Sequence, residues 1–329
     1  MKIVFEDGEA KLAKAEPGPP GDNQLLVQAR CSLISPGTEV AHLTERVDDP
    51  WFRQNPGYAL AGDVVQMGDR VSGFAVGDRV IALRNHASLN VVSADPWETL
   101  PIPAGVTYEQ ATFVPLLSVA MHGLRRARLE LGEAIAIYGA GLLGLLAIQL
   151  ARLDGAEQVI AIDLAPDRLD WATRVGADLA LSPTDEGFRA RIAEATHGKG
   201  PSIILEATGN SRVIPEALKI AAAGGRIVCT GTMPEKVEMD LFTEFIRKEL
   251  NLIAAFQPLC PTADNLYYRW PQQENRRLAL RLLARGALRV DELITHRFRY
   301  REAPAAYERL RQGDRSTIGV LFDWRAGHD

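Results

Sequence analysis

A glycine-rich segment, Gly139-Ala140-Gly141-Leu142-Leu143-Gly144, most narrows the folds open to this chain. It follows a short apolar run, Ala134–Tyr138, and leads into a longer apolar run with helical character. A G-x-G-x-x-G spacing at a strand-to-helix turn is typical of dinucleotide binding. We expect Gly139 to allow a tight turn, Gly141 to let a pyrophosphate approach the backbone, and Gly144 to let the helix pack closely on the strand.

The sequence around these glycines alternates between strand and helix. Short continuous apolar runs recur from about residue 115 to residue 258, separated by helical patterns such as Gly144–Asp154 and Asp167–Val175. This alternation predicts an α/β domain in which helices cover both faces of a doubly wound parallel sheet. The six predicted strands are Ala134–Tyr138, Val159–Ile162, Leu179–Leu181, Ile203–Leu205, Arg226–Cys229 and Asn251–Ala254.

The flanking parts of the chain have a different character. Residues 1 to about 114 contain short apolar or alternating runs separated by Gly, Pro and Asp, which is typical of an irregular, mostly β domain. We therefore predict that residues 115–258 form one domain, inserted between residues 1–114 and 259–329 of the other, with the active site in the cleft between them. In the last part we expect helices over Asn275–Arg285 and Ala303–Arg311, and strands over Leu293–Phe298 and Ile318–Phe322.

A carboxylate follows the second predicted strand of the inserted domain. Asp163 stands where a carboxylate can accept hydrogen bonds from both ribose hydroxyls and repel a 2′-phosphate, which favours NAD over NADP. Arg168 is the counter-indication, because a guanidinium nearby could bind a 2′-phosphate. The other expected cofactor contacts are Leu142, Leu143, Ala207, Thr208, Gly209 and Gly231, of which the last four could equally be ordinary strand-to-helix turns.

Composition argues against several classes of protein. The chain has 329 residues, is 47% hydrophobic and carries a formal net charge of -5, and it has no apolar run of about 18 residues that would span a membrane. Basic residues cluster at Arg125-Arg126-Ala127-Arg128 and at Arg276-Arg277 without interleaved aromatics. We interpret both clusters as solvated helix faces, so no nucleic-acid partner is expected. The three cysteines are scattered and the N-terminus lacks a secretion signal, which together predict a cytoplasmic protein.

Several segments together resemble the medium-chain dehydrogenase/reductase superfamily, the relatives of zinc alcohol dehydrogenase. The resemblance covers nearly the whole chain. It implies a Rossmann domain inserted in a GroES-like catalytic domain, an oxidoreductase, and a homodimer joined edge to edge near Asn251–Phe256. Besides the glycine segment, the matching segments are Ser35-Pro36-Gly37-Thr38-Glu39, Asn55-Pro56-Gly57-Tyr58-Ala59-Leu60-Ala61-Gly62, Gly77-Asp78-Arg79-Val80, Ser118-Val119-Ala120-Met121-His122 and Glu206-Ala207-Thr208-Gly209.

The positions that hold the catalytic zinc in this superfamily depart from its pattern. Ser35 stands where a cysteine is expected, Tyr58 replaces the histidine, and the third position falls near Pro115. Zinc prefers thiolate, imidazole or carboxylate ligands, which these residues do not supply. We therefore expect no zinc. Among zinc-lacking relatives the segments look most like bacteriochlorophyllide dehydrogenase, which implies NAD-linked interconversion of a secondary alcohol and a ketone, with specialised biosynthesis as a setting.

Without a metal, the reaction needs a base for the hydroxyl proton and donors for the oxyanion. Tyr58 is the first candidate: its phenol could donate to a carbonyl oxygen or, with a lowered pKa, accept a proton, although it could equally fill the vacated metal pocket. The resemblance implies a proton-relay hydroxyl at Thr38, and His42, one turn later, could pass that proton to solvent. Glu39 aligns with an acid that often has a structural role.

Two other functions stay open. One is a NADPH-dependent enoyl or quinone reductase, since zinc-free members of the superfamily often reduce activated double bonds, although Asp163 counts against it. The other is a non-catalytic NAD-binding protein. The sequence does not identify the small-molecule substrate.

Overall fold

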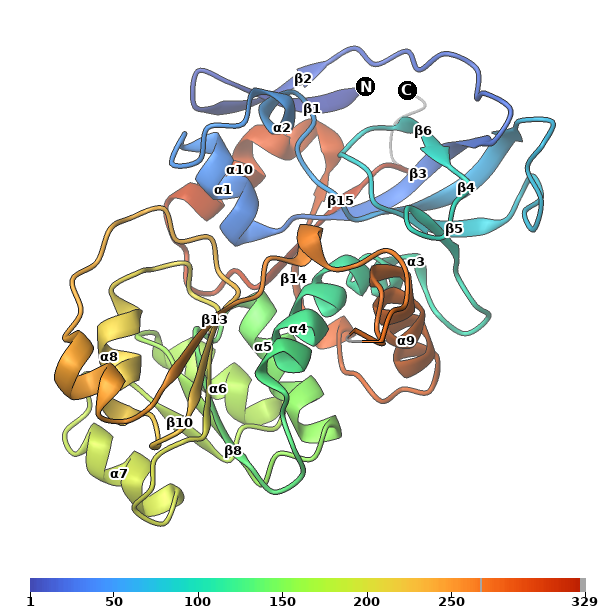
Figure 1. Ribbon diagram of the computed structural model, residues 1–329. Helices are drawn as coiled ribbons and strands as arrows, with labels where there is room; N and C mark the ends of the chain where they lie inside the picture. Colours follow the sequence, from blue (N-terminus) through green and yellow to red (C-terminus); the bar gives the residue numbers. More distant parts are fainter. Residues whose placement is uncertain (267, 326–329) are drawn as a thin grey trace. The chain divides into compact units, whose positions relative to one another are not determined.

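The computed structural model describes residues 1–266 and 268–325 and divides into two compact units (Figure 1). One, the central unit, is continuous and extends over Leu116–Cys260. The other, the discontinuous unit, combines Met1–Pro115 with the chain from Pro261 onward. Each unit has its own sheets.

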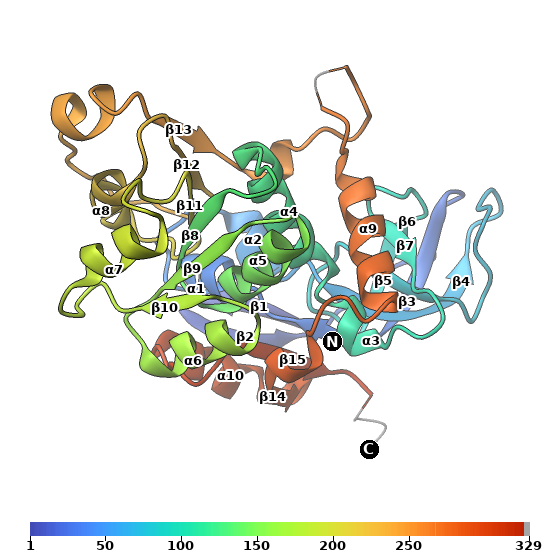
Figure 2. The same ribbon diagram turned by 90° about the horizontal axis from the view of Figure 1, so that it is seen from below.

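The central unit contains a six-stranded sheet in which every neighbouring pair of strands is parallel. The strands lie in the order β10-β9-β8-β11-β12-β13, which Figure 2 shows. The predicted parallel sheet is confirmed, and it is the doubly wound arrangement of an α/β dinucleotide-binding fold. The strands are β8 (Ala134–Tyr138), β9 (Gln158–Ile162), β10 (Leu179–Leu181), β11 (Ile203–Glu206), β12 (Arg226–Cys229) and β13 (Asn251–Ala254).

Helices cover both faces of this sheet. In Figures 1 and 2, α4, α5 and α6 lie on one face, and α7 and α8 lie on the other. The apolar face of α8 packs with Ile204 of β11 and Ile160 of β9 in one fully buried cluster. The helices of this unit are α4 (Val114–Ala127), α5 (Leu142–Leu153), α6 (Pro166–Arg174), α7 (Phe188–Ala195) and α8 (Val213–Ile220), followed by a π-helical turn η1 (Leu241–Ile246) and a 3-10 turn η2 (Gln257–Leu259).

The winding direction of the sheet reverses between β8 and β11. These two strands are neighbours, with Tyr138 paired with Glu206, but the chain runs from β8 outward to β10 before it returns to β11. In open α/β sheets, ligands bind outside the carboxyl ends of the strands at such a reversal. The turns that follow Tyr138 and Glu206 therefore mark the expected ligand position.

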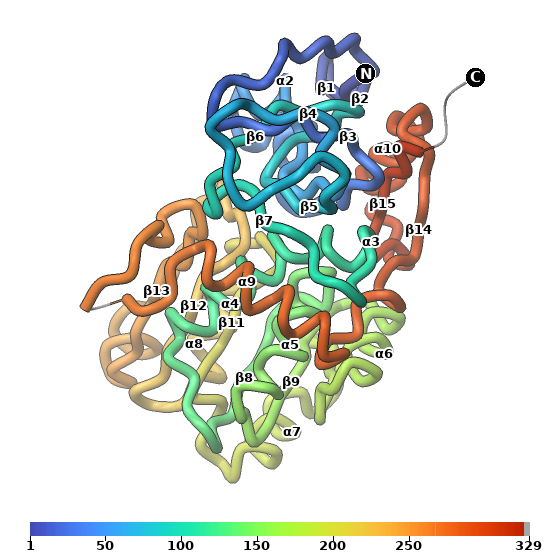
Figure 3. The backbone as a smooth tube through the Cα atoms, turned by 90° about the vertical axis from the view of Figure 1, so that its right-hand side faces the viewer, coloured from blue at the N-terminus to red at the C-terminus, as the bar shows by residue number. Residues whose placement is uncertain are grey.

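The discontinuous unit contains a mostly antiparallel seven-stranded sheet and a separate β1-β2 hairpin. The main sheet has the order β14-β15-β3-β4-β5-β7, and β6 also pairs with β3. The C-terminal strand β15 pairs with β3, far earlier in the sequence, and both can be followed in Figure 3. The strands are β1 (Lys2–Glu6), β2 (Glu9–Ala13), β3 (Gln24–Leu33), β4 (Leu60–Met67), β5 (Arg79–Ala82), β6 (Leu89–Ser93), β7 (Thr99–Pro101), β14 (Ile294–Arg299) and β15 (Gly319–Asp323).

Three short helices of this unit were not predicted from the sequence. In α2, the Asp49 side chain accepts a hydrogen bond from the Phe52 N–H at 3.0 Å, and in α3 Thr107 and Gln110 form a reciprocal capping box. Such caps stabilise helices that are too short to show apolar periodicity. The helices and 3-10 turns are α1 (Pro36–Leu43), α2 (Pro50–Gln54), α3 (Tyr108–Ala111), α9 (Gln272–Ala284), η3 (Asp291–Leu293), η4 (Tyr300–Glu302) and α10 (Ala303–Arg311).

The interpretation of Arg276 as a solvated residue is wrong. Arg276 lies on α9 and is only 2% exposed. Its guanidinium donates hydrogen bonds to the backbone carbonyls of Pro96, Trp97 and Glu98, in the turn before β7. One residue of the basic pair, Arg276, is therefore buried and joins α9 to this turn. In the described part of the chain, no helix combines the length and the hydropathy needed to cross a bilayer.

Candidate functional site

The turn between β8 and α5 presents its backbone with few side chains, and we call residues 139–144 the cofactor cradle. Gly139 has a φ of +96°, which favours glycine. A Cβ on Gly144 would lie 1.7 Å from the carbonyl oxygen of Gly139, so α5 can begin here only if Gly144 has no side chain. A Cβ on Gly141 would meet nothing closer than 3.9 Å. Gly141 therefore leaves open space at the position where a ligand would approach the backbone.

The first turn of α5 faces the same place. Gly141 is the N-cap of this twelve-residue helix, and no side chain caps it. Leu142 is buried and Leu143 is half-buried, so this turn offers its backbone N–H groups without a competing polar side chain. The first N–H groups of a helix have no partner within the helix and carry partial positive charge. This arrangement fits a pyrophosphate.

Asp163 and Arg168 lie beside the cradle. The two carboxylate oxygens of Asp163 accept hydrogen bonds from the N–H groups of Ala140, at 2.8 Å, and Ala165, at 2.9 Å. Each oxygen keeps a second acceptor site, so the carboxylate can still bind a ribose diol. Arg168 lies 4.0 Å from Asp163 through Nη1, and its Nε is buried without a hydrogen-bond partner. An acidic and a basic group thus share the position that decides between NAD and NADP.

The turns after β11 and β12 meet at the same edge of the sheet. A Cβ on Gly139 would lie 2.9 Å from Cγ2 of Thr208, and a Cβ on Gly231 would lie 2.5 Å from the Gly209 nitrogen. Thr208 is exposed, whereas Ala207, Gly209 and Gly231 are half-buried. The structure therefore brings every residue predicted to contact the cofactor to one edge of the central unit.

Sequence reasoning did not include Glu206 among the site residues. It is fully buried at the end of β11, and its Oε1 accepts hydrogen bonds from the N–H groups of Thr208 and Gly209. Burial raises the pKa of this carboxyl, and its hydrogen bonds oppose the rise. An acid as the last residue of an apolar strand, just before Ala-Thr-Gly, was the signal that could have revealed it.

In the discontinuous unit, three hydroxyls form a chain at the positions where the resemblance implies metal ligation and proton relay. The Tyr58 phenol donates a hydrogen bond to Ser35 Oγ at 2.6 Å, and Ser35 Oγ lies 3.4 Å from Thr38 Oγ1. Burial raises the pKa of Tyr58, against the opposing effect of its hydrogen bonds with Ser35 and Thr38. The lowered pKa considered for Tyr58 is therefore wrong, and this phenol is suited to donate a hydrogen bond rather than to act as a base.

Glu39 is fully buried directly behind these hydroxyls. One carboxylate oxygen accepts the Ser35 N–H at 2.7 Å, and the other lies 3.0 Å from His86 Nε2 and 2.5 Å from the Tyr307 hydroxyl. The other ring nitrogen of His86 bonds with Ser32 Oγ at 2.7 Å. Glu39 therefore has a structural role in this unit, where it fixes the backbone of Ser35.

The relay from Thr38 to His42 is not formed. His42 is buried with its ring edge-on to Phe52, at a centroid separation of 4.1 Å. Its Nδ1 has no hydrogen-bond partner, and burial lowers its pKa. Although Thr38 and His42 share one helix face, no hydrogen bond joins them in the described structure.

The side chains at the expected zinc position do not fit that metal. The Ser35 and Tyr58 side chains are neutral hydroxyls bonded to each other, and the side chain of Pro115 has no atom that could ligate a metal. Within residues 1–266 and 268–325, no three His, Cys, Asp or Glu side chains are grouped so that they could hold a metal ion. This donor set does not supply a zinc site.

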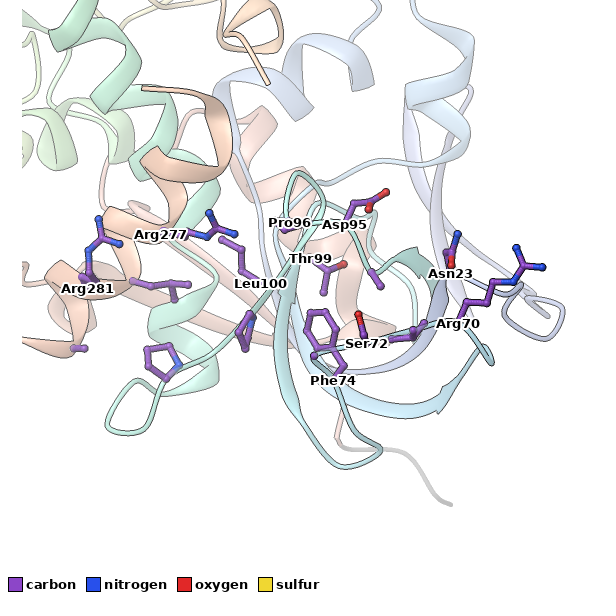
Figure 4. A pocket seen from close by; sticks show the side chains of 17 residues that line it. Asn23, Arg70, Ser72, Phe74, Asp95, Pro96, Thr99, Leu100, Arg277 and Arg281 are labelled. Atoms are coloured by element: carbon purple, nitrogen blue, oxygen red, sulfur yellow. The ribbon is translucent and has the colours of Figure 1, made fainter. Parts of the chain in front are cut away.

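A separate pocket of about 770 Å³ lies in the discontinuous unit (Figure 4). Arg277 and Arg281 of α9 line one side of it, and Phe74 and Thr99 line the middle. Figure 4 shows Arg70 extending away from the other side, so the three guanidinium groups do not converge on one point. No residue predicted to be catalytic lines this pocket, and we do not assign it to the reaction.

Comparison with known proteins shows similarity to dehydrogenases, both in sequence and in fold. Residues 143–266 match the model of the zinc-binding dehydrogenase family. The chain is 32% identical to sorbitol dehydrogenase of Pongo abelii over 94% of this chain and 92% of that protein. Two solved structures show the same fold, each with a TM-score of 0.82 over 98% of both chains. They are a putative zinc-binding dehydrogenase of Sinorhizobium meliloti bound to NADP, 23% identical, and a short chain alcohol dehydrogenase of Escherichia coli complexed with NADH, 20% identical.

The chain therefore belongs to the zinc-binding dehydrogenase family, the alcohol-dehydrogenase-like members of the medium-chain superfamily, and is an oxidoreductase. The predicted α/β fold, with a parallel-sheet domain and a mostly β domain, is confirmed.

The buried contacts of Glu39 predict a large effect on stability. Glu39→Ala leaves the Ser35 N–H, His86 and the Tyr307 hydroxyl without their buried partner, and should lower the free energy of unfolding by about 3–5 kcal/mol. Tyr307→Phe should cost only about 1 kcal/mol. Chemical denaturation followed by circular dichroism measures both, with Glu308→Ala, at a half-buried glutamate of α10, as control. A Glu39→Ala midpoint equal to that of Glu308→Ala would contradict the structural role.

Proposed function

From its membership of the zinc-binding dehydrogenase family, we propose that this chain is a zinc-independent, NAD-dependent oxidoreductase that interconverts a secondary alcohol and a ketone. The observation that carries the proposal is the hydrogen bond between Tyr58 and Ser35, at the positions where zinc relatives place metal ligands. We place the chain in a zinc-lacking branch that resembles bacteriochlorophyllide dehydrogenase, with specialised biosynthesis as its setting. A cytoplasmic location stays a prediction from the three free cysteines.

The three linked hydroxyls of Tyr58, Ser35 and Thr38 can polarise the substrate oxygen in place of a zinc ion. Zinc normally polarises the substrate oxygen as a Lewis acid. Hydrogen atoms of hydroxyls rotate, so the chain from Tyr58 through Ser35 to Thr38 can reverse and present the phenol proton to a carbonyl oxygen. Bound NADH would supply the hydride to the carbonyl carbon, while Tyr58 stabilises the developing oxyanion and gives it a proton.

Asp163 supports NAD as the cofactor. Its carboxylate retains acceptor sites for a ribose diol and would repel a 2′-phosphate. Arg168, close to both Asp163 and Gly141, is the observation that favours a second candidate, the NADPH-dependent enoyl or quinone reductase. The two similar structures described above contain NADP in one case and NADH in the other, so likeness of fold does not decide between the cofactors. Survival of NAD binding with no turnover of alcohols, ketones, enones or quinones would instead favour a non-catalytic NAD-binding protein.

We also propose a homodimer formed through β13. This strand is the edge of the six-stranded sheet and is mostly exposed. Large apolar side chains lie exposed on β13 and on the segments before and after it, which is unusual for a monomer surface. They are Leu241, Phe242, Ile246, Leu252, Phe256 and Leu259.

Loss of the Tyr58 hydroxyl should reduce turnover without unfolding the protein. Tyr58→Phe should lower kcat with secondary alcohols or ketones by about 100-fold, because one oxyanion donor is lost. Absorbance of NADH over a panel of such substrates measures the rate. The chelator-washed wild type should keep full activity. Full activity of Tyr58→Phe, or one zinc per chain in elemental analysis of the washed protein, would contradict this mechanism.

The open space at Gly141 allows a test of the cofactor site. Gly141→Ala should lower the thermal unfolding temperature by only a few degrees, because the new Cβ meets only Arg168 Nη1 at 3.9 Å and the cost is limited to a weaker N-cap. It should weaken NAD binding by about tenfold or more, because the methyl group occupies the approach of the pyrophosphate. Calorimetric titration of both proteins with NAD and NADP measures this. Tighter binding of NADP than of NAD by the wild type would support the reductase instead.

A charge on the edge strand should prevent dimer formation. Leu252→Asp places a carboxylate on the exposed face of β13, where it would be desolvated in the dimer. Sedimentation equilibrium should show a dimer for the wild type and a monomer for this variant. Leu131→Asp, at an exposed leucine away from β13, should remain dimeric. A wild-type monomer at micromolar concentration would contradict the proposal.

A further inference from the structure

The carboxylate of Glu206 occupies an unusual position at the carboxyl edge of the central sheet. Its Oε1 accepts three hydrogen bonds, from the Thr208 N–H at 2.6 Å, the Thr208 hydroxyl at 2.5 Å and the Gly209 N–H at 2.9 Å. The whole residue has no exposed surface. Glu206 therefore holds the turn after β11 in place through buried hydrogen bonds.

The second oxygen of this carboxylate lies against the turn after β12. A Cβ on Gly231 would stand 2.6 Å from Oε2, and this oxygen is buried without a hydrogen-bond partner. The carboxylate thus lies between the turns after β11 and β12. A dinucleotide with its adenosine ribose at Asp163, after β9, and its pyrophosphate at Gly141, after β8, would extend across the reversal of the sheet, so its nicotinamide end would lie above these two turns. These turns contain Thr208 and Gly209 on one strand end and Gly231 on the next.

The negative charge of Glu206 is not neutralised locally. No described lysine or arginine forms an ion pair with it. Burial raises the pKa of this carboxyl, but its hydrogen bonds favour the anion, which is the form present at pH 8, and a buried charge is screened far less than a surface charge. A charged ligand part bound above these turns would therefore experience the field of Glu206.

We propose that the charge of Glu206 makes the cofactor site favour the oxidised dinucleotide over the reduced one. The nicotinamide ring carries a positive charge when oxidised and none when reduced, and a fixed buried anion at that end of the site attracts only the charged form. The inference rests on the proposed NAD site and adds a residue that sets the balance between its two redox states.

The experiment compares three ligands in calorimetric titrations of the full chain at pH 8. NAD⁺ and NADH differ in ring charge, and ADP-ribose lacks the nicotinamide. Glu206→Gln keeps the shape of the side chain and a carbonyl acceptor for Thr208 and Gly209, but removes the charge. It should weaken NAD⁺ binding by about 3- to 10-fold and leave NADH and ADP-ribose within about twofold of the wild type. Glu216→Gln, which removes an exposed carboxylate of the same unit, should change none of the three.

Several outcomes would overturn the proposal. Equal weakening of all three ligands would show that Glu206 acts only by ordering the turn. An unchanged ratio of NAD⁺ to NADH affinity would show that its charge does not act on the ring. Glu206→Asp keeps the charge and should keep the wild-type ratio, so a ratio lost in this variant would also count against it, even if Glu206→Gln does not fold. Failure of the wild type to bind any of the three ligands would instead refute the proposed NAD site.

Discussion

The carbonyl oxygen of Gly139 lies where the side chain of residue 144 would otherwise be. Because residue 144 is a glycine, α5 can start directly against the end of β8 and direct its first turn at the space above Gly141. Asp163 then accepts the Ala140 N–H and joins the end of β9 to the same turn. The cofactor edge of the central unit depends on this one close approach between helix and strand.

The discontinuous unit is organised around a buried acid. Glu39 binds the backbone of Ser35 and contacts His86 and Tyr307, which come from distant parts of the sequence. The hydroxyls of Ser35 and Tyr58 lie in front of this acid. These neutral hydroxyls stand at the positions where the resemblance to zinc alcohol dehydrogenase implies metal ligands.

The parts of the fold that local patterns specify were predictable. Continuous apolar runs identified all six strands of the central unit, because strands buried on both faces carry little else, and the glycines identified the turn after β8. The helices α1 and α2 were missed because eight and five residues are too few to show a clear apolar periodicity. The environment of Arg276 was missed because its partners lie far away in sequence.

The pKa of Tyr58 illustrates the same limit for chemistry. The sequence indicated a phenol at the site but did not reveal that this phenol is buried. Burial is what raises its pKa. Glu206 was visible in the sequence, but its three hydrogen bonds depend on the turn that it shapes.

The pairing of β15 with β3 affects how this protein can fold during synthesis. The Trp324 indole donates a hydrogen bond to Ser32 Oγ, so the last part of the described chain completes a network that begins in β3. A ribosome must therefore release the chain through β15 before the discontinuous unit can close its sheet. The central unit is one continuous stretch and can fold earlier, as nascent domains generally do. Residues Cys31–Leu33 of β3, which pair with β15, would meanwhile lack their partner strand, which is the period when chaperone protection would matter most.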